Sequence, residues 1–223
     1  RFACEDHGSC SRPPAPGASA VSYCGSTRRC PPRGRPHSRL PDHPRLSLDS
    51  LHEEGDSPTP GLVHRYPDKA LFLAVGVCPV YCRFCFRKHK ETREQAPPTV
   101  ADVDAALDYI AGNDHIREVV LTGGEPLVRP GIVDLVRMLA CVEGIDDLAM
   151  TTNAILLNDY AKGLAQAVLQ RVNISLDTLR EETFVQIARR GGLDRVLSGI
   201  EAAQQAGFRR IRLNAVAIRG ITE

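Results

Sequence analysis

Short apolar runs alternate with longer amphipathic segments along most of the chain. The run Leu71-Phe-Leu-Ala-Val75 ends at Gly76, and a short apolar segment with such an ending predicts a buried strand. Four later runs have the same character and are predicted as strands, at residues 118–122, 147–152, 171–176 and 210–217. The pattern therefore predicts about five strands in all.

The segments between these strands have the period of amphipathic helices. Thr99 and Asp102 have the spacing of an N-terminal capping box. The apolar face that follows consists of Val103, Ala106, Leu107 and Ile110. Further helices are predicted after Gly131, over residues 158–169, after the capping pair Thr178 and Glu181, and around residues 193–200. This alternation of strand and helix predicts an α/β fold with a parallel sheet and right-handed crossovers.

Residues 1–46 differ in composition from the rest of the chain. They hold half of the 16 prolines, with many Arg, Ser and Gly residues and almost no periodic apolar pattern. Such a segment cannot bury enough apolar surface to offset its ordering entropy, so we predict a disordered extension before one domain at residues 47–223. The spacing of Cys4, Cys10, Cys24 and Cys30 differs from that of the close pairs in zinc sites, which argues against a metal site there.

Three cysteines, Cys78, Cys82 and Cys85, follow the first predicted strand. They leave the carboxyl end of that strand, which is where α/β folds bind ligands. Cysteine thiolates hold iron–sulfur clusters, and only three of them would leave one iron of a [4Fe–4S] cluster open to an outside ligand. The alternative, a structural zinc site, closes with a fourth Cys or His at short spacing, and His89 is the nearby candidate. The sequence favours the open iron–sulfur site.

The three-cysteine motif, together with Gly123-Gly124-Glu125-Pro126, resembles the radical S-adenosylmethionine (SAM) enzymes. The resemblance implies a partial (β/α)6 TIM-like barrel, which this chain would leave C-terminally incomplete after about five strands. It implies that Cys78, Cys82 and Cys85 ligate a [4Fe–4S] cluster whose open iron binds SAM. It also implies cleavage of SAM to a 5′-deoxyadenosyl radical and an electron donor such as flavodoxin or ferredoxin.

The same resemblance places further residues around SAM. In the family the Gly-Gly turn binds the SAM amino group, a residue at the position of Ser175 contacts SAM, and an aromatic at the position of Phe84 lies near adenine. Independently of the resemblance, glycine permits a close backbone approach and a positive φ, and proline fixes the exit of a turn. The predicted cofactor-binding residues are Phe84, Gly123, Gly124, Glu125, Pro126 and Ser175.

Polar and apolar residues alternate on the last two predicted strands. Asn173 and Ser175 share one face of the fourth strand, and Arg212 and Asn214 share one face of the fifth. The apolar positions should meet the outer helices, so the polar ones should face the lumen of the barrel. A self-satisfied hydrogen-bond network could explain them, but we favour a ligand-lined lumen because the cysteines lie at the same mouth.

Two branches of the family resemble different parts of the chain. Residues 48–121 resemble the lysine 2,3-aminomutases, in which an arginine at the position of Arg87 binds the substrate carboxylate and pyridoxal phosphate is a second cofactor. Residues 122–223 resemble the GTP 3′,8-cyclases of molybdenum cofactor biosynthesis. The second resemblance implies that Thr151 lies at the GTP site, with Arg212 and Asn214 facing the substrate.

Charge and cysteine chemistry narrow the possible functions. The formal net charge of +1 argues against a general nucleic-acid or membrane-surface binder. No run of about 18 apolar residues predicts a membrane-spanning helix. Thiolates that hold a cluster require a reducing compartment, which favours the cytoplasm. We therefore predict a radical SAM enzyme with a small-molecule substrate: a cyclase-like lyase, alternatively an aminomutase-like isomerase, or else a truncated, non-catalytic iron–sulfur fragment.

Overall fold

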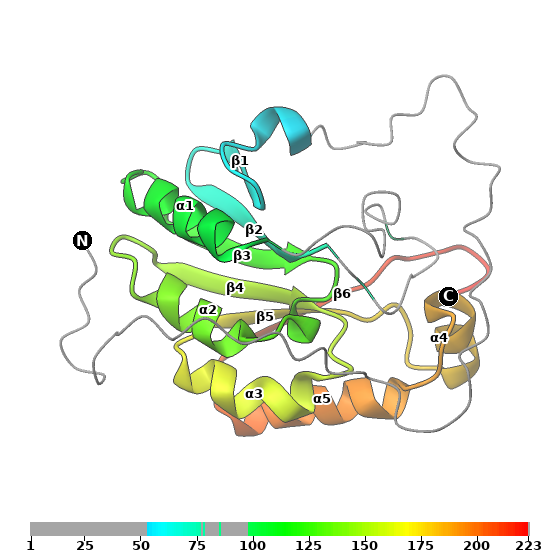
Figure 1. Cartoon of the computed structure of the whole chain (residues 1–223). Helices are drawn as coiled ribbons and strands as arrows, with labels where there is room; N and C mark the ends of the chain where they lie inside the picture. The colour runs from blue at the N-terminus through cyan, green and yellow to red at the C-terminus, as the bar shows by residue number, and fades with distance from the viewer. Residues whose placement is uncertain (1–52, 77, 79–84, 86–97, 223) are drawn as a thin grey trace, which may run out of the picture.

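The computed structural model describes residues 53–76, 78, 85 and 98–222 (Figure 1). The predicted extension at residues 1–46, with its four cysteines, lies outside the described residues. Within the described part, no helix is long and apolar enough to cross a membrane.

One six-stranded sheet forms the centre of the structure, with its strands in chain order from β1 to β6. The strands are β1 (Leu62–Tyr66), β2 (Lys69–Val75), β3 (Glu118–Gly123), β4 (Asp147–Thr152), β5 (Arg171–Ser175) and β6 (Arg210–Asn214). β1 pairs antiparallel with β2, and every later pair is parallel. The five predicted strands are thus confirmed as β2 to β6, although β6 ends before the predicted residue 217.

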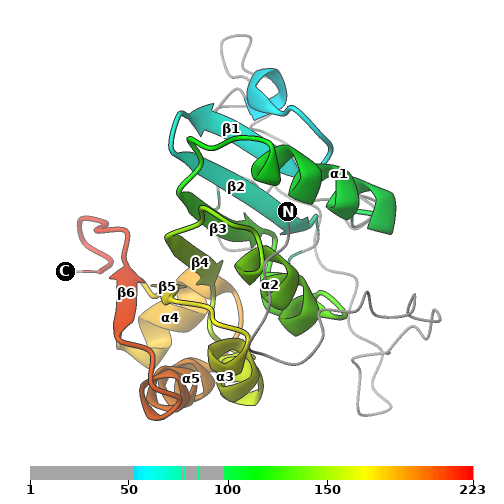
Figure 2. The same cartoon turned by 90° about the vertical axis from the view of Figure 1, so that its left-hand side faces the viewer.

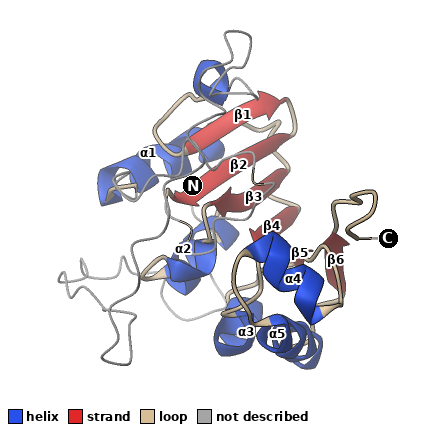
Figure 3. Cartoon of the chain, turned by 90° about the vertical axis from the view of Figure 1, so that its right-hand side faces the viewer, coloured by secondary structure: helices blue, strands red, loops and turns tan. Residues whose placement is uncertain are grey.

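Helices cover one face of this sheet. They are α1 (Val100–Ala111), α2 (Ile132–Ala140), α3 (Leu157–Gln166), α4 (Glu181–Ala188) and α5 (Leu193–Gln205), with short 3-10 turns η1 (Glu53–Asp56) and η2 (Pro126–Val128). α1, α2, α3 and α5 lie along the convex side of the curved sheet (Figure 2). α4 lies beyond the carboxyl ends of the strands (Figures 1 and 3). The arrangement is the predicted α/β fold, an open part of a (β/α)-type barrel.

Side-chain alternation separates the core that the helices cover from the opposite face of the sheet. On β5, Val172 and Ile174 are fully buried in the core that the helices cover, and Asn173 lies on the opposite face. The other parallel strands follow the same rule, since Phe72, Leu121 and Met150 belong to the helix-covered core. The apolar faces predicted for α1 and α2 are buried as well. We call the opposite, concave face of the sheet the lumen.

The helix starts show one confirmed and one wrong prediction. Thr99 caps α1, and Asp102 completes a reciprocal capping box. At α4 the cap residue is Arg180, whose side chain makes no capping bond. The Thr178 hydroxyl instead accepts a hydrogen bond from the Arg180 backbone N–H, which closes a turn before the helix begins. The capping box predicted from Thr178 and Glu181 is therefore wrong.

Candidate functional site

The candidate site lies at the edge of the sheet where the five parallel strands end. Cys78 comes three residues after β2, the Gly123-Gly124 turn ends β3, and Asn153 follows β4. Ser175 is the last residue of β5, and Asn214 the last of β6. Parallel strands bring their carboxyl ends to one side, so sequence-distant residues share one mouth. Cys78 and Cys85 are half-buried, whereas Cys82, Phe84 and Arg87 lie outside the described residues.

The Gly-Gly turn packs directly onto the strand that leads to the cysteines. Gly123 has a φ of +113°, and a Cβ there would lie far inside van der Waals contact with the carbonyl oxygen of Val75. The backbone N–H of Gly124 donates to the same oxygen at 2.8 Å. The structure thus explains why a glycine occupies position 123, which the sequence alone did not: its missing side chain allows the turn to approach the end of β2 closely.

The carboxylate of Glu125 holds the next strand against this turn. Glu125 is 2% exposed, and its Oε1 accepts hydrogen bonds from the Thr152 hydroxyl at 2.6 Å and the Leu127 N–H at 3.2 Å. Its Oε2 accepts from the Asn153 N–H at 2.8 Å. Burial raises the pKa of Glu125 above its ordinary value, although these hydrogen bonds oppose the rise. The cofactor-binding role predicted for Glu125 stays a prediction; here its carboxylate positions the loop after β4.

Arg129 connects both ends of the segment that carries the cysteines. Its Nη1 donates to the carbonyl oxygen of Ala74, near the end of β2, at 2.7 Å. Its Nη2 donates to the carbonyl oxygen of Pro98, just before α1, at 3.4 Å. Partial burial lowers the pKa of Arg129, but a guanidinium keeps its charge at any physiological pH. One side chain therefore contacts the backbone on both sides of the cysteine-bearing segment.

The predicted substrate-facing residues lie in two neighbouring rows across the lumen. Strand register pairs Thr151 with Asn173 and Asn173 with Arg212. One step nearer the carboxyl edge, Ser175 pairs with Asn214. Thr151 is half-buried and Asn173 buried, whereas Ser175, Arg212 and Asn214 are exposed. The fold thus brings the predicted lumen residues side by side.

A group of ion pairs closes the lumen at the opposite, amino-terminal edge, and sequence reasoning missed it. We call it the floor; it consists of Lys69, Glu118, Asp147, Arg171 and Arg210, each the first residue of its strand. Lys69 Nζ lies 2.9 Å from Glu118 Oε2, and Arg171 Nη2 lies 2.5 Å from Glu118 Oε1 and 3.0 Å from Asp147 Oδ2. A charged residue at the start of every parallel strand was the signal that could have revealed it.

Opposing effects set the pKa of Glu118 in this floor. Burial alone would raise the pKa, but hydrogen bonds and charge from Lys69 and Arg171 outweigh burial, so the pKa of Glu118 lies below its ordinary value. The carboxylate is therefore the form that the fold stabilises.

Comparison with known proteins places this architecture in a family. The model of the radical SAM superfamily matches residues 74–223, which include the cysteine segment, the Gly-Gly turn and every strand from β3 to β6. The chain belongs to the radical SAM superfamily.

Curated relatives of this radical SAM chain are named as GTP 3′,8-cyclases. The cyclase of Rhodopirellula baltica is 47% identical over 167 residues, which cover 73% of this chain and 46% of the relative. GTP 3′,8-cyclase 1 of Pseudomonas aeruginosa is 47% identical over 145 residues, covering 64% of this chain and 44% of the relative. The chain spans about half the length of the curated relatives it matches. The 73% coverage exceeds residues 122–223, so cyclase similarity extends into the part whose motif resembles the aminomutases.

Solved radical SAM structures share the fold at low sequence identity. Streptococcus suis SuiB bound to S-adenosylmethionine superposes with a TM-score of 0.56 at 22% identity, covering 71% of this chain and 36% of SuiB. HydG, a maturase of the [FeFe]-hydrogenase, superposes with a TM-score of 0.55 at 17% identity, covering 66% of this chain and 34% of HydG. These likenesses concern the fold alone.

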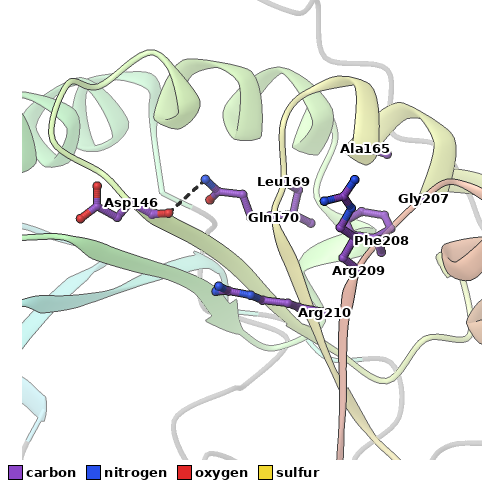
Figure 4. Close-up of a pocket in the computed structure, with 8 residues that line it drawn as sticks. All are labelled: Asp146, Ala165, Leu169, Gln170, Gly207, Phe208, Arg209 and Arg210. Atoms are coloured by element: carbon purple, nitrogen blue, oxygen red, sulfur yellow. Dashed lines mark hydrogen bonds between the residues drawn. The ribbon is translucent and has the colours of Figure 1, made fainter.

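A hollow in the described part of this radical SAM chain lies at the amino-terminal edge of the strands. It measures about 390 Å³ and is lined by Asp146, Ala165, Leu169, Gln170, Gly207, Phe208, Arg209 and Arg210 (Figure 4). Most of these residues come from the loops that precede β4, β5 and β6, while Ala165 belongs to α3 and Arg210 is the first residue of β6. Gln170 Nε2 donates to the Asp146 carbonyl oxygen at 3.1 Å within the hollow. Active sites of (β/α) barrels lie at the carboxyl edge, so this amino-edge hollow is a poor candidate for the catalytic site.

Proposed function

We propose that this chain is the core of an enzyme that binds a [4Fe–4S] cluster through Cys78, Cys82 and Cys85 and cleaves SAM. Membership of the radical SAM superfamily supports the proposal, and so does the position of Cys78, three residues after the end of the strand onto which the Gly-Gly turn packs. Thiolates are the ligands that iron–sulfur clusters use, so these residues fit the group. When bound, the cluster supplies one electron, with which SAM separates into methionine and a 5′-deoxyadenosyl radical.

The polypeptide contributes binding, orientation and shielding to this chemistry. Gly123 and Gly124, with their backbone held by Val75, are proposed to contact SAM together with Ser175, Glu125, Pro126 and Phe84. Thr151, Arg212 and Asn214 are proposed to hold the substrate in the lumen, where the radical takes a hydrogen atom from it. Holding both partners in one site converts a bimolecular step into a near-unimolecular one and shields the radical from water.

We propose GTP as the substrate, in the cyclisation that begins molybdenum cofactor biosynthesis. The observation that carries this choice is the 47% identity to GTP 3′,8-cyclases. An electron-donor protein such as flavodoxin or ferredoxin, and a reducing compartment such as the cytoplasm, follow from the cluster chemistry.

A lysine-type aminomutase reaction is the second candidate, and the motif from Cys78 to Lys88 favours it. In that reaction Arg87 would bind the substrate carboxylate, and pyridoxal phosphate would be required. A third candidate is a non-catalytic fragment. The observation in its favour is that β6 is exposed at the edge of the sheet, because unpaired strand edges promote association with other chains.

Anaerobic reconstitution tests the proposal. The chain is loaded with iron and sulfide, reduced with dithionite, and incubated with SAM and either GTP or lysine with pyridoxal phosphate. We expect 5′-deoxyadenosine with GTP and none from Cys78→Ser, while Cys141→Ser, which alters a buried core cysteine, should keep the product. Product with lysine alone would favour the aminomutase, and no product from a cluster-loaded chain would refute the enzyme proposal.

A further inference from the structure

Arg171 reaches from the floor into the row of lumen residues above it. Its side chain is 4% exposed, and two carboxylates fix the guanidinium: Nε donates to Asp147 Oδ2 at 3.1 Å, and Nη2 to Glu118 Oε1 at 2.5 Å. The remaining nitrogen, Nη1, donates to the side-chain oxygen of Asn173 at 3.1 Å. Arg171 and Asn173 lie two residues apart on β5, so their side chains share the lumen face.

This contact sets which way the Asn173 amide faces. A guanidinium has donors and no acceptor, so the Asn173 atom that meets Nη1 must be the oxygen. The amide nitrogen then faces β4, where Nδ2 lies 3.4 Å from the Thr151 hydroxyl oxygen and donates to it. Since Asn173 donates to that oxygen, the Thr151 hydrogen is not used between these two side chains and can be donated to a ligand.

The row across β4, β5 and β6 therefore presents hydrogen-bond donors to the lumen. They are the Thr151 O–H, the second Nδ2 hydrogen of Asn173 and the guanidinium of Arg212, which pairs in register with Asn173. Such a row suits a ligand with acceptor oxygens or nitrogens and negative charge, and it is mismatched to a ligand that offers donors.

We propose that Arg171 is a positioning residue for substrate binding: by fixing the Asn173 amide it makes Thr151 a donor to an acceptor-rich, anionic substrate such as a nucleoside triphosphate. This inference rests on the proposed function, in which Thr151 and Arg212 face the substrate. Arg171 acts on the row through Asn173, to which its Nη1 donates, and has no direct contact with the substrate in this proposal.

Asn173→Asp tests the inference with the least disturbance to the fold. The aspartate keeps the acceptor for Arg171 but places an oxygen opposite Thr151, so the hydroxyl turns to donate to the aspartate and is lost to the substrate. We expect the KM for GTP in 5′-deoxyadenosine formation to rise about tenfold, with kcat at saturating GTP little changed. SAM cleavage without substrate should stay as in the parent chain.

Arg171→Lys and Arg210→Met form a matched pair of floor variants. Lysine retains the charge but cannot reach both carboxylates and Asn173 in the fork geometry of arginine, so the KM for GTP should rise as in Asn173→Asp. Arg210 lies 3.7 Å from Asp147 and has no contact with Asn173 among the described residues, so Arg210→Met should leave the KM unchanged. An unchanged KM in both Asn173→Asp and Arg171→Lys, in a parent that turns over GTP, would overturn the inference and leave the proposed function standing.

A measurement without substrate keeps the inference testable if GTP is not turned over. In NMR spectra of the full chain, the side-chain amide of Asn173 should be a single slowly flipping pair of signals in the parent and in Arg210→Met. In Arg171→Lys it should broaden through exchange between orientations, because the contact that fixes it is lost. An equally sharp amide in Arg171→Lys would overturn the inference, whereas loss of GTP turnover in the parent would count against the proposed function alone.

Discussion

The carboxylate of Glu125 and the hydroxyl of Thr152 lie 2.6 Å apart, and this contact joins the turn after β3 to the end of β4. It is one of three hydrogen bonds that Glu125 accepts from the described residues. Because the turn also packs against Val75, three consecutive parallel strands are held in register at the mouth of the barrel.

Replacing Glu125 by glutamine should therefore cost stability without creating a cavity. The new amide NH2 would face either the Asn153 N–H or the pair formed by Thr152 and Leu127, and a donor would be left unpaired. We expect a loss of about 1–3 kcal/mol in the free energy of unfolding, measured by urea denaturation. Glu143→Gln, at an exposed position, should change it by less than about 0.5 kcal/mol. Equal effects at both positions would contradict the positioning role.

Gly123→Ala should destabilise the chain more than Gly144→Ala. Both glycines have positive φ, at +113° and +95°, so both substitutions introduce backbone strain of about 1–3 kcal/mol. Only at Gly123 would the added Cβ collide with backbone, that of Val75, while nothing lies within 4 Å at Gly144. Thermal unfolding of the two variants measures the difference. Similar melting temperatures would mean that the contact with β2 contributes little.

Arg129→Met should loosen the attachment of the cysteine-bearing segment. The substitution leaves the carbonyl oxygens of Ala74 and Pro98 without their donors. We expect a loss of about 1–3 kcal/mol in unfolding free energy and less iron bound per chain after reconstitution. Arg137→Met removes an arginine that is 53% exposed and pairs with Asp134 within α2, so it should change neither quantity measurably. Full iron content in Arg129→Met would argue against the clamp.

Glu118→Gln tests the floor through its pH dependence. The folded state lowers the pKa of Glu118, so the ion pairs with Lys69 and Arg171 stabilise the fold above the ordinary glutamate pKa and are lost as pH falls through the folded value. At neutral pH the variant should be about 1–3 kcal/mol less stable than the parent. The difference should shrink in acid, because a protonated Glu118 resembles glutamine. A difference that is constant from neutral pH to acid would contradict the lowered pKa.

Local patterns were enough to predict most of the strands and helices. The apolar faces of α1 and α2, the capping box at Thr99 and the five parallel strands follow from periodicities of two and 3.6 residues, which depend on neighbours along the chain. The strand β1 escaped this reasoning because its sequence, Leu-Val-His-Arg-Tyr, does not alternate apolar and polar residues, and its antiparallel pairing with β2 is a tertiary contact. Thr178 was misassigned because a threonine hydroxyl can accept a backbone hydrogen bond in a turn as well as in a helix cap, and here it accepts from Arg180 in a turn.

In the candidate site, too, local features were predicted from the sequence and long-range contacts were not. Alternation on β5 and β6 predicted that Asn173, Ser175, Arg212 and Asn214 share the lumen, because alternation is a local property. It could not predict that Glu125 turns toward Thr152 or that Arg171 reaches Glu118, since those partners are 27 and 53 residues away along the chain. Such contacts depend on the order of strands in the sheet, which only the folded structure supplies.

The floor lies at one end of the strands and the cysteines at the other, and this separation has an evolutionary consequence. Substitutions near the mouth can alter which molecule is held there without disturbing the charges that keep the strand starts together. A gene encoding this chain can therefore drift toward new substrates through changes at positions such as Arg212 or Asn214 while its folding remains intact. Arg171 connects the floor to Asn173 in the lumen, so a change there would affect folding and substrate choice together.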